Sequence, residues 1–155
     1  MSIITVKGKI LLETELKRLV EVERPKVIRA IEEARAHGDL SENAEYAAAK
    51  EKQSFVEGRI AEISSKMATF EVIDPSLLKL DKIVFGATVT MLNVETNENI
   101  KYQIVGQDEA DISKGMISIM SPIARAMIGR FEGDVIIVKS PKGEVEYEVL
   151  KIEYL

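Results

Sequence analysis

The sequence contains no cysteine, no tryptophan and a single histidine among its 155 residues. The lack of cysteine excludes a disulfide framework and cysteine-held zinc, and one histidine (His37) cannot build a histidine-ligated metal centre. No apolar run approaches the roughly 20 residues that a membrane-spanning helix needs, and the N-terminal residues lack the apolar core of a signal peptide. The net charge of -5 gives no overall attraction for duplex DNA. We therefore expect a soluble cytoplasmic protein without a membrane partner.

The first half of the chain carries the apolar spacing of helices. Apolar residues recur every three or four positions in two long runs separated by a polar turn. The first run consists of Leu12, Leu16, Leu19, Val27, Ile31 and Ala34, with Glu23 completing its seam, and the second of Val56, Ile60, Ile63, Met67 and Phe70. Two such runs, each of about 30 residues and so about 45 Å long, predict an antiparallel coiled-coil hairpin.

One irregularity interrupts the first helical run. A strict heptad alternates steps of three and four, but one extra residue is inserted near Pro25. Proline inside a helix also removes a hydrogen bond and bends the axis. The sequence therefore predicts a kink or a local unwinding at Arg24-Pro25 rather than two separate helices. Thr5 is the expected N-cap of the run.

The second half switches to the period of two that is typical of strands. Alternation is clear in "ATVTML", "NIKYQIV" and "EVEYEVLKIEYL", and turn signals lie at residues 96–99 and 141–143. One short helix is predicted in "SPIARAMIG", with Ser121 as its N-cap and Gly129 as its stop. The fold class is therefore α+β. We expect a helical hairpin in residues 1–75 and a small antiparallel sheet domain with one short helix in residues 76–155.

The turn between the two helical runs, "HGDLSENAEY", is rich in carboxylates. Asp39 could be the N-cap of the second helix, with Glu42 completing a capping box. Alternatively, Asp39 and Glu42 are hard oxygen ligands suited to Mg²⁺, which usually keeps several waters and shares its ligands with phosphates. Two acids supply only part of such a site, so the remaining ligands would belong to a partner enzyme. The two interpretations are compatible.

Two separated segments carry a family resemblance. "ARAHGDLSENAEYAAAKEKQSFVEGRIAEI" (34–63) resembles the tip and second helix of the bacterial Gre transcript cleavage factors, and "SIMSPIARAMIGRFEGD" (118–134) resembles their second signature. The resemblance implies that the hairpin enters the secondary channel of bacterial RNA polymerase, while an FKBP-like C-terminal domain docks at the channel's rim. It also implies stimulation of the polymerase's own Mg²⁺-dependent cleavage of the 3′ end of backtracked RNA.

The resemblance assigns roles around the turn. It makes Asp39 and Glu42 the catalytic acids, holding a Mg²⁺ shared with the polymerase active site, so that the protein needs no cofactor of its own. It places Glu45 and Tyr46 near the tip, where we expect them to support the loop. His37 is expected to structure the loop or to be exposed rather than to transfer protons.

Two further groups of residues match the family. Arg35 and Lys50 correspond to a basic patch beside the extruded RNA, although exposed helix charges are often only solvated. The expected polymerase-docking residues are Ser121, Pro122, Ile123 and Ala124, which also have an ordinary explanation as a helix start. The factor is expected to act as a monomer.

Three other functions remain open at this point. A channel-occupying regulator would inhibit polymerase without cleavage, and the intact acid pair argues against it. An independent Mg²⁺-dependent nuclease is disfavoured by the shortage of ligands. A folding catalyst does not follow from an FKBP-like fold, because function belongs to the site, and the sequence indicates no peptide pocket.

Overall fold

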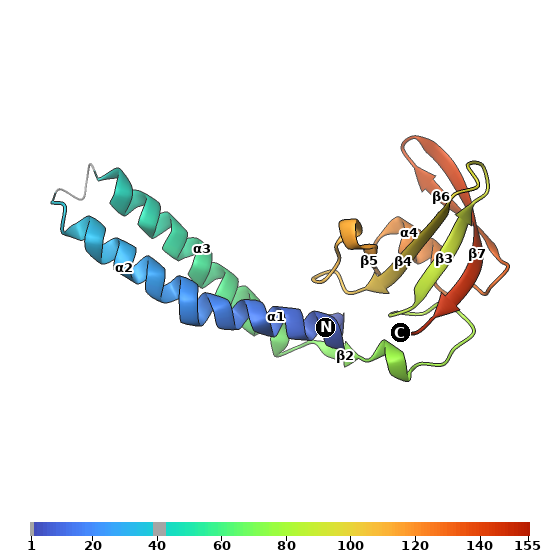
Figure 1. Ribbon diagram of the computed structural model, residues 1–155, viewed down its shortest axis with the longest axis horizontal. Coiled ribbons are helices and arrows are strands. Elements are labelled where there is room, and N and C mark those ends of the chain that lie inside the picture. Colours follow the sequence, from blue (N-terminus) through green and yellow to red (C-terminus); the bar gives the residue numbers. More distant parts are fainter. Residues whose placement is uncertain (1, 39–42) are drawn as a thin grey trace. The chain divides into compact units, whose positions relative to one another are not determined.

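The computed structural model describes residues 2–38 and 43–155 (Figure 1). The chain divides into two compact units. The hairpin unit comprises Lys9–Phe70, and the sheet unit comprises Met1–Gly8 together with Glu71–Leu155. Within the described residues, no helix combines the length and apolar character needed to cross a membrane.

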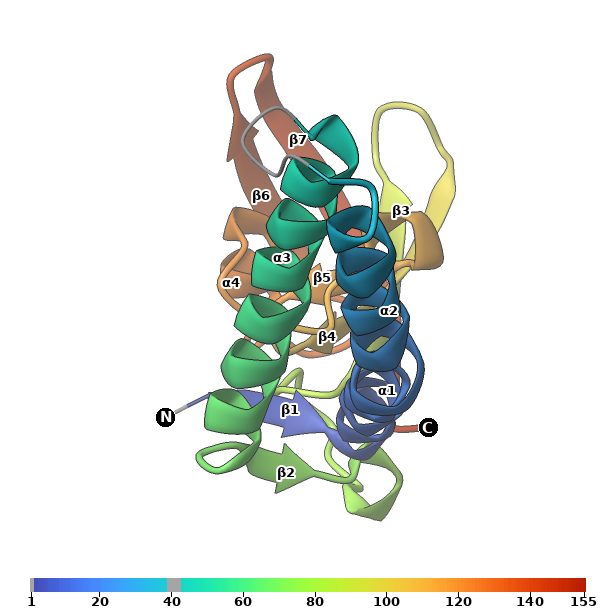
Figure 2. The same ribbon diagram turned by 90° about the vertical axis from the view of Figure 1, so that its left-hand side faces the viewer.

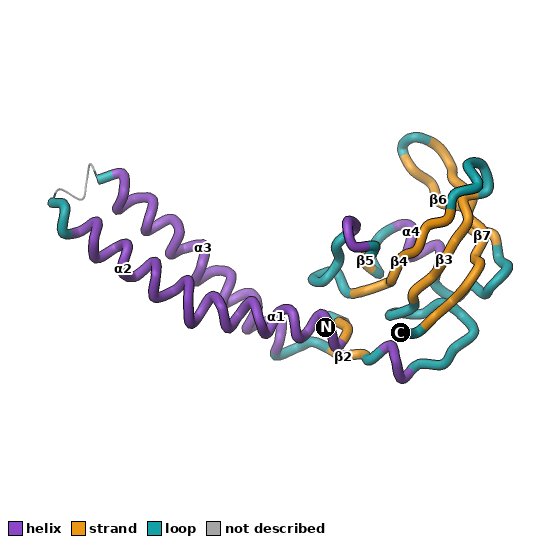
Figure 3. The backbone as a smooth tube through the Cα atoms, in the orientation of Figure 1, coloured by secondary structure: helices purple, strands orange, loops and turns teal. Residues whose placement is uncertain are grey.

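The hairpin unit is built from two antiparallel helical runs (Figures 1 and 3). The first is continuous and consists of α1 (Val6–Arg18), a π-turn (Leu19–Glu23) and α2 (Arg24–Arg35). The second is α3 (Ala44–Met67), which packs against α2. The predicted helical hairpin is therefore confirmed. Its second helix has 24 residues and ends before the predicted limit.

The extra residue near Pro25 is accommodated by the π-turn. Its hydrogen bond runs from the Arg24 N–H to the Leu19 carbonyl, five residues back, whereas an α-helix uses four. This wider turn absorbs one residue, so the apolar seam faces α3 on both sides of it. The predicted local unwinding is confirmed, directly before Arg24, and the proline lies at the start of α2.

The core of the hairpin unit is the predicted seam. Buried seam residues on the first run are Leu12, Leu19, Val27, Ile31 and Ala34, and those on α3 are Val56, Ile60 and Ile63. Helix propensity alone leaves helices marginal in water, so this apolar contact is the main source of the unit's stability.

The sheet unit contains a five-stranded sheet in the order β5-β4-β3-β7-β6. Its strands are β3 (Thr88–Asn93), β4 (Asn99–Val105), β5 (Met116–Ser118), β6 (Val135–Ser140) and β7 (Gly143–Glu153). β3, β4 and β7 coincide with the predicted strand segments. The pairing is antiparallel except between β4 and β5, which are parallel. The sheet is therefore mixed, with a mainly antiparallel centre.

The core of the sheet unit lies where α4 (Pro122–Met127) covers one face, packed against β6. Fully buried side chains come from the segment before β3, from strand positions and from the helix, namely Ile83, Ala87, Val89, Met91, Ile104, Ala124, Met127, Ile136 and Val149. The predicted helix signals are confirmed. The Ser121 hydroxyl accepts a hydrogen bond from the Ala124 N–H at 3.3 Å, and Gly129 follows the helix with a φ of 82°.

A second, two-stranded sheet joins sequence-distant parts of the sheet unit (Figure 2). β1 (Ile3–Thr5) pairs in parallel with β2 (Glu71–Ile73). A 3₁₀ turn at Pro75–Leu77 follows β2, and another lies at Ile112–Lys114. The sequence pattern did not predict β1 or β2, because three residues are too few to show alternation.

Candidate functional site

The acidic turn lies between α2 and α3, and its flanks are described on both sides. α2 ends at Arg35, and the chain then turns through Gly38, whose φ of 104° is a backbone conformation that favours glycine. The predicted acids Asp39 and Glu42 lie outside the described residues. The described part of the site consists of the residues that flank these acids.

Asn43 ties the two helix ends together across the turn. Its side-chain oxygen accepts a hydrogen bond from the Tyr46 N–H at 3.1 Å, which makes Asn43 the N-cap of α3. Its amide nitrogen donates to the carbonyl of Ala34, near the end of α2, at 2.8 Å. The interpretation of Asp39 as the cap of this helix is therefore wrong. Asparagine directly before an alanine-rich run was the sequence signal for the true cap.

With Asn43 as the cap of α3, one of the two explanations for the acids no longer applies. Capping was the ordinary reason to find Asp39 and Glu42 in the turn, and Asn43 now fills that role. Glu45, in the first turn of α3, already complements the positive end of the helix dipole. The acid pair is thus left without the structural explanation that the sequence suggested.

His37 and Glu45 face each other across the turn. The His37 Nδ1 atom lies 3.7 Å from the Glu45 Oε2 atom, and both side chains are more than half exposed. This arrangement agrees with the expected exposed role of His37. Tyr46 is half-buried at the same end of α3. Support of the tip by Glu45 and Tyr46 stays a prediction.

The two expected RNA-contacting residues lie on different helices near the turn. Arg35 ends α2 and is exposed, and Lys50 is exposed on α3, where its ammonium donates to the Gln53 side-chain oxygen at 3.0 Å. Gln53 is neutral, so this hydrogen bond does not neutralise the Lys50 charge. RNA contact by these residues stays a prediction.

The described residues contain no group of three or more side chains that could hold a metal ion. A closed metal site is thus absent from residues 2–38 and 43–155. The donor chemistry of Asp39 and Glu42 suits one part of a Mg²⁺ site, because Mg²⁺ in proteins is commonly held by one or two carboxylates, with waters and phosphates completing its shell.

The expected docking residues surround the start of α4. The Ser121 hydroxyl donates to the Ser118 carbonyl at 2.6 Å in addition to capping the helix. Pro122 is exposed and Ile123 half-buried, whereas Ala124 is fully buried in the core. The sequence analysis did not single out the exposed apolar side chains nearby in the chain, namely Met120, Ile128 and Phe131.

A buried carboxylate in the sheet unit was also missed. Glu109 is only 9% exposed and accepts hydrogen bonds from the Thr5 N–H at 2.7 Å, the Thr5 hydroxyl at 2.5 Å and the Gly106 N–H at 3.0 Å. Thr5 in turn accepts from the Gly8 N–H at 3.1 Å, so the predicted N-cap is confirmed. Glu109 therefore holds the residue that begins α1. No local pattern could reveal this, because Thr5 and Glu109 are 104 positions apart.

The comparison with known protein families matches nearly the whole chain. The family model described as transcription elongation factor, N-terminal, matches residues 2–72, and the one described as transcription elongation factor, GreA/GreB, C-term, matches residues 78–154. The chain belongs to the GreA/GreB family of transcription elongation factors. The resemblance seen in the sequence is thereby confirmed.

Two relatives with high sequence identity agree with this membership. The chain is 58% identical over 153 residues to transcription elongation factor GreA of Ralstonia nicotianae, covering 98% of this chain and 97% of the relative. It is 53% identical over 152 residues to that of Alkalilimnicola ehrlichii, covering 97% and 96%. Among solved structures, GreA factor homolog 1 of Thermus thermophilus is 24% identical, with a TM-score of 0.44 and 97% of both chains covered.

In this GreA/GreB family member, ion pairs cross between the helices of the hairpin. Arg59 on α3 bonds both carboxylate oxygens of Glu15 at 2.7 and 2.9 Å, and Arg24 bonds both of those of Glu57 at 2.8 Å. The hydrogen bond from Arg59 lowers the pKa of Glu15, and that from Arg24 lowers the pKa of Glu57. Both carboxylates are therefore charged at neutral pH.

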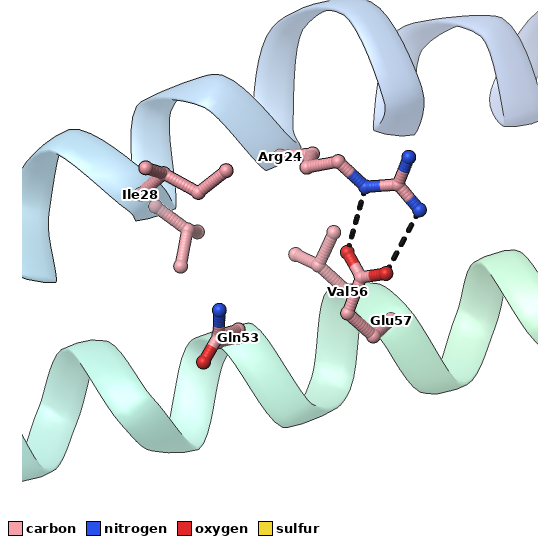
Figure 4. Close-up of a pocket in the computed structure, with 6 residues that line it drawn as sticks. Arg24, Ile28, Gln53, Val56 and Glu57 are labelled. Carbon is pink, nitrogen blue, oxygen red and sulfur yellow. Dashed lines mark hydrogen bonds and ion pairs between the residues drawn. The ribbon is translucent and has the colours of Figure 1, made fainter.

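A shallow hollow lies beside the second of these ion pairs (Figure 4). It has a volume of about 260 Å³ and is lined by Arg24, Val27, Ile28, Gln53, Val56 and Glu57. Arg24 and Glu57 bond to each other at its edge, so their polar groups are already satisfied. The hollow offers an apolar floor but no free charge that would orient a small-molecule ligand.

Proposed function

We propose that this protein binds bacterial RNA polymerase in the cytoplasm and stimulates the polymerase's own cleavage of backtracked RNA. The hairpin would enter the secondary channel and deliver the turn between α2 and α3 to the active site, and cleavage at the extruded 3′ end would rescue arrested complexes. The observation that carries the proposal is the acid pair in a turn whose helix cap is Asn43. Family membership supports the partner.

The hairpin has dimensions suited to a channel. It is two helices thick, and each helix with side chains is roughly 10–12 Å across. The 24 residues of α3 extend about 36 Å at 1.5 Å per residue. An apolar seam and interhelical ion pairs hold the pair together without further layers. Such an arm is narrow enough to present a small charged turn at its end.

The protein would be an accessory factor rather than a nuclease. Asp39 and Glu42 would hold a Mg²⁺ whose remaining ligands come from the polymerase and the RNA, and no cofactor of the protein's own is needed. When bound, that ion supplies charge stabilisation for the attacking and leaving oxygens of phosphodiester cleavage. Glu45 and Tyr46 would support the turn, and Arg35 and Lys50 would contact RNA phosphates.

The sheet unit would dock at the channel's rim. Ser121, Pro122 and Ile123 would form the contact surface, and the buried Ala124 would fix the start of α4 beneath them. A single copy suffices for this arrangement, so we propose that the protein acts as a monomer. The rim contact would supply affinity, and the turn would supply chemistry.

The test uses purified, backtracked bacterial elongation complexes and follows release of short 3′ RNA fragments. The variants Asp39→Asn and Glu42→Gln remove the charges while keeping side-chain size, and Glu51→Gln, at an exposed position of α3, is the matched control. We expect each of the first two to lose about 100-fold or more of the stimulated rate. Glu51→Gln should retain most of it. All three should bind polymerase with similar affinity.

Three results would contradict the proposal. Equal stimulation by the Asp39→Asn and Glu42→Gln double variant would remove the acids from the chemistry. Inhibition of transcription by the wild-type protein with no cleavage products would favour a channel-occupying regulator instead. RNA cleavage without polymerase would indicate an independent nuclease.

A further inference from the structure

The π-turn places a charged residue in the apolar seam of the hairpin. Leu19 begins the turn and is buried, and Glu23 ends it at the next seam position. The Glu23 side chain is only 14% exposed. Leucine would fill such a position with more favourable packing, because a partly buried charge gives up much of its hydration.

The cations that compensate Glu23 come from both helical runs. Its Oε1 atom accepts from the Arg18 guanidinium, on its own run, at 3.0 Å. Its Oε2 atom lies 3.9 Å from the Lys52 ammonium on α3. Arg18 and Lys52 are each more than half exposed, so both reach inward from the edges of the seam. The carboxylate is therefore paired across the helices at one axial alignment.

An apolar seam alone does not select that alignment. Apolar side chains repeating every three or four positions can pack in more than one register, and a single polar seam residue is a recognised way to choose between them at some cost in stability. A slip of one residue moves one helix about 1.5 Å along the other, and a slip of one turn moves it 5.4 Å. Either displacement pulls Lys52 away from Glu23 and leaves the carboxylate without its cross-helix partner.

We infer that Glu23, placed in the seam by the π-turn, is a positioning residue that sets the register of α2 against α3 together with the interhelical Arg24–Glu57 and Glu15–Arg59 pairs. The bond between Asn43 and Ala34 joins the far ends of the same two helices, so their register also determines where the turn begins and ends. This inference rests on the proposed function, in which the register determines how Asp39 and Glu42 are presented to the polymerase. Glu23 then lowers the stability of the hairpin but fixes the position of the turn.

The experiment exploits the absence of cysteine, which permits two unique spin labels. Arg29→Cys on α2 and Ser54→Cys on α3 are both exposed positions, and electron–electron resonance gives the distance distribution between their labels. Glu23→Leu tests the inference in this background. Glu21→Leu is the matched control, because it makes the same exchange on the exposed side of the same π-turn.

We expect a single narrow distance for the parent and for Glu21→Leu. Glu23→Leu should give a broadened or double distribution together with an unchanged or higher Tm. In the cleavage assay its rate should fall in proportion to the slipped fraction, because a misplacement of about 1 Å can cost about 100-fold. Higher stability with lower activity is a combination that a merely structural ion pair does not produce.

The outcomes separate this inference from the proposed function. A single narrow distance in Glu23→Leu overturns the inference, whether or not the variant is less stable. A split distribution with full cleavage activity overturns the link between register and tip. If the parent stimulates no cleavage but Glu23→Leu still splits the distribution, the proposed function fails while the register role stands.

Discussion

The change Gly8→Ala should destabilise the sheet unit through Glu109. A Cβ added at Gly8 would lie 2.0 Å from the Glu109 Oε2 atom and 2.5 Å from its Cδ atom. Both distances are far below van der Waals contact, so the carboxylate must move. The carboxylate then loses the hydrogen bonds that it accepts from the Thr5 N–H at 2.7 Å and from the Thr5 hydroxyl at 2.5 Å.

The expected magnitude follows from these two bonds. A hydrogen bond to a charged group contributes about 1.5–3 kcal/mol, and buried donors left without an acceptor add to the loss. Alanine in place of glycine in a helix returns up to about 1 kcal/mol. The net loss in the free energy of unfolding is therefore about 2–5 kcal/mol. For a chain of this size that corresponds to a Tm lower by roughly 10 °C.

The measurement is thermal and urea unfolding followed by the near-ultraviolet signal of tyrosine, since Tyr102, Tyr147 and Tyr154 all lie in the sheet unit. Gly58→Ala is the matched control, because a Cβ there meets nothing within 4 Å. It should stabilise the hairpin by about 1 kcal/mol. The change from glycine to alanine is thus expected to lower the free energy of unfolding at position 8 and to raise it at position 58.

A double-mutant cycle tests the mechanism itself. In a Glu109→Ala background the obstructing carboxylate is gone and only the Ile4 Cγ1 atom, 2.9 Å from the added Cβ, remains too close, so Gly8→Ala should cost much less than in the wild type. If Gly8→Ala costs as much in that background as in the wild type, the loss does not pass through Glu109 and the reasoning fails. Stabilisation by Gly8→Ala in the wild type would refute it as directly.

Two further predictions concern the hairpin unit. Asn43→Ala removes the α3 cap and the bond to Ala34, so the helical melt at 222 nm should show a loss of about 1–2 kcal/mol. Asn43→Asp keeps the cap acceptor but not the donor to Ala34, so it should lose less; an unchanged stability of Asn43→Asp would contradict the bridging role, and equal losses in the two variants would contradict the capping role. The Glu15–Arg59 pair should make the hairpin acid-sensitive, because folding lowers the pKa of Glu15. The pair therefore stabilises the folded hairpin at pH values above 4.5, the usual pKa of this group, and this contribution is lost as the pH falls through the pKa of the folded state. At pH 7 the free energy of unfolding of Arg59→Gln should therefore be lower than that of the wild type by less than about 1 kcal/mol, and this difference should disappear in acid. A difference that does not depend on pH would argue against the pair.

Local sequence patterns predicted most of the helices and strands. The seam from Leu12 to Ala34 predicted the first helical run, and its one extra residue predicted the distortion that the π-turn at Leu19–Glu23 accommodates. Strand alternation located β3, β4 and β7, and Ser121 with Gly129 located α4. These signals were legible because burial on one face imposes a period of 3.6 or 2 on neighbouring residues.

Other features had no local signal. The parallel pair of β1 and β2 is too short to show alternation, and the edge strand β6 exposes Val135 and Ile137, which obscures its period. At the turn, Asp39 and Asn43 are both good capping residues by type. Only the position of the first turn of α3 decided for Asn43.

The amino-acid sequence by itself determined the two helical runs, the central strands and the acidic turn that identifies the family, because each depends on residues within a few positions of one another. Only the tertiary structure decided that Glu109 accepts hydrogen bonds from Thr5, the N-cap of α1, that Asn43 joins α2 to α3, and that Glu23 is paired across the seam. Those contacts depend on which distant segments the hydrophobic cores bring together, and that information resides in the packing of the whole chain rather than in any local pattern.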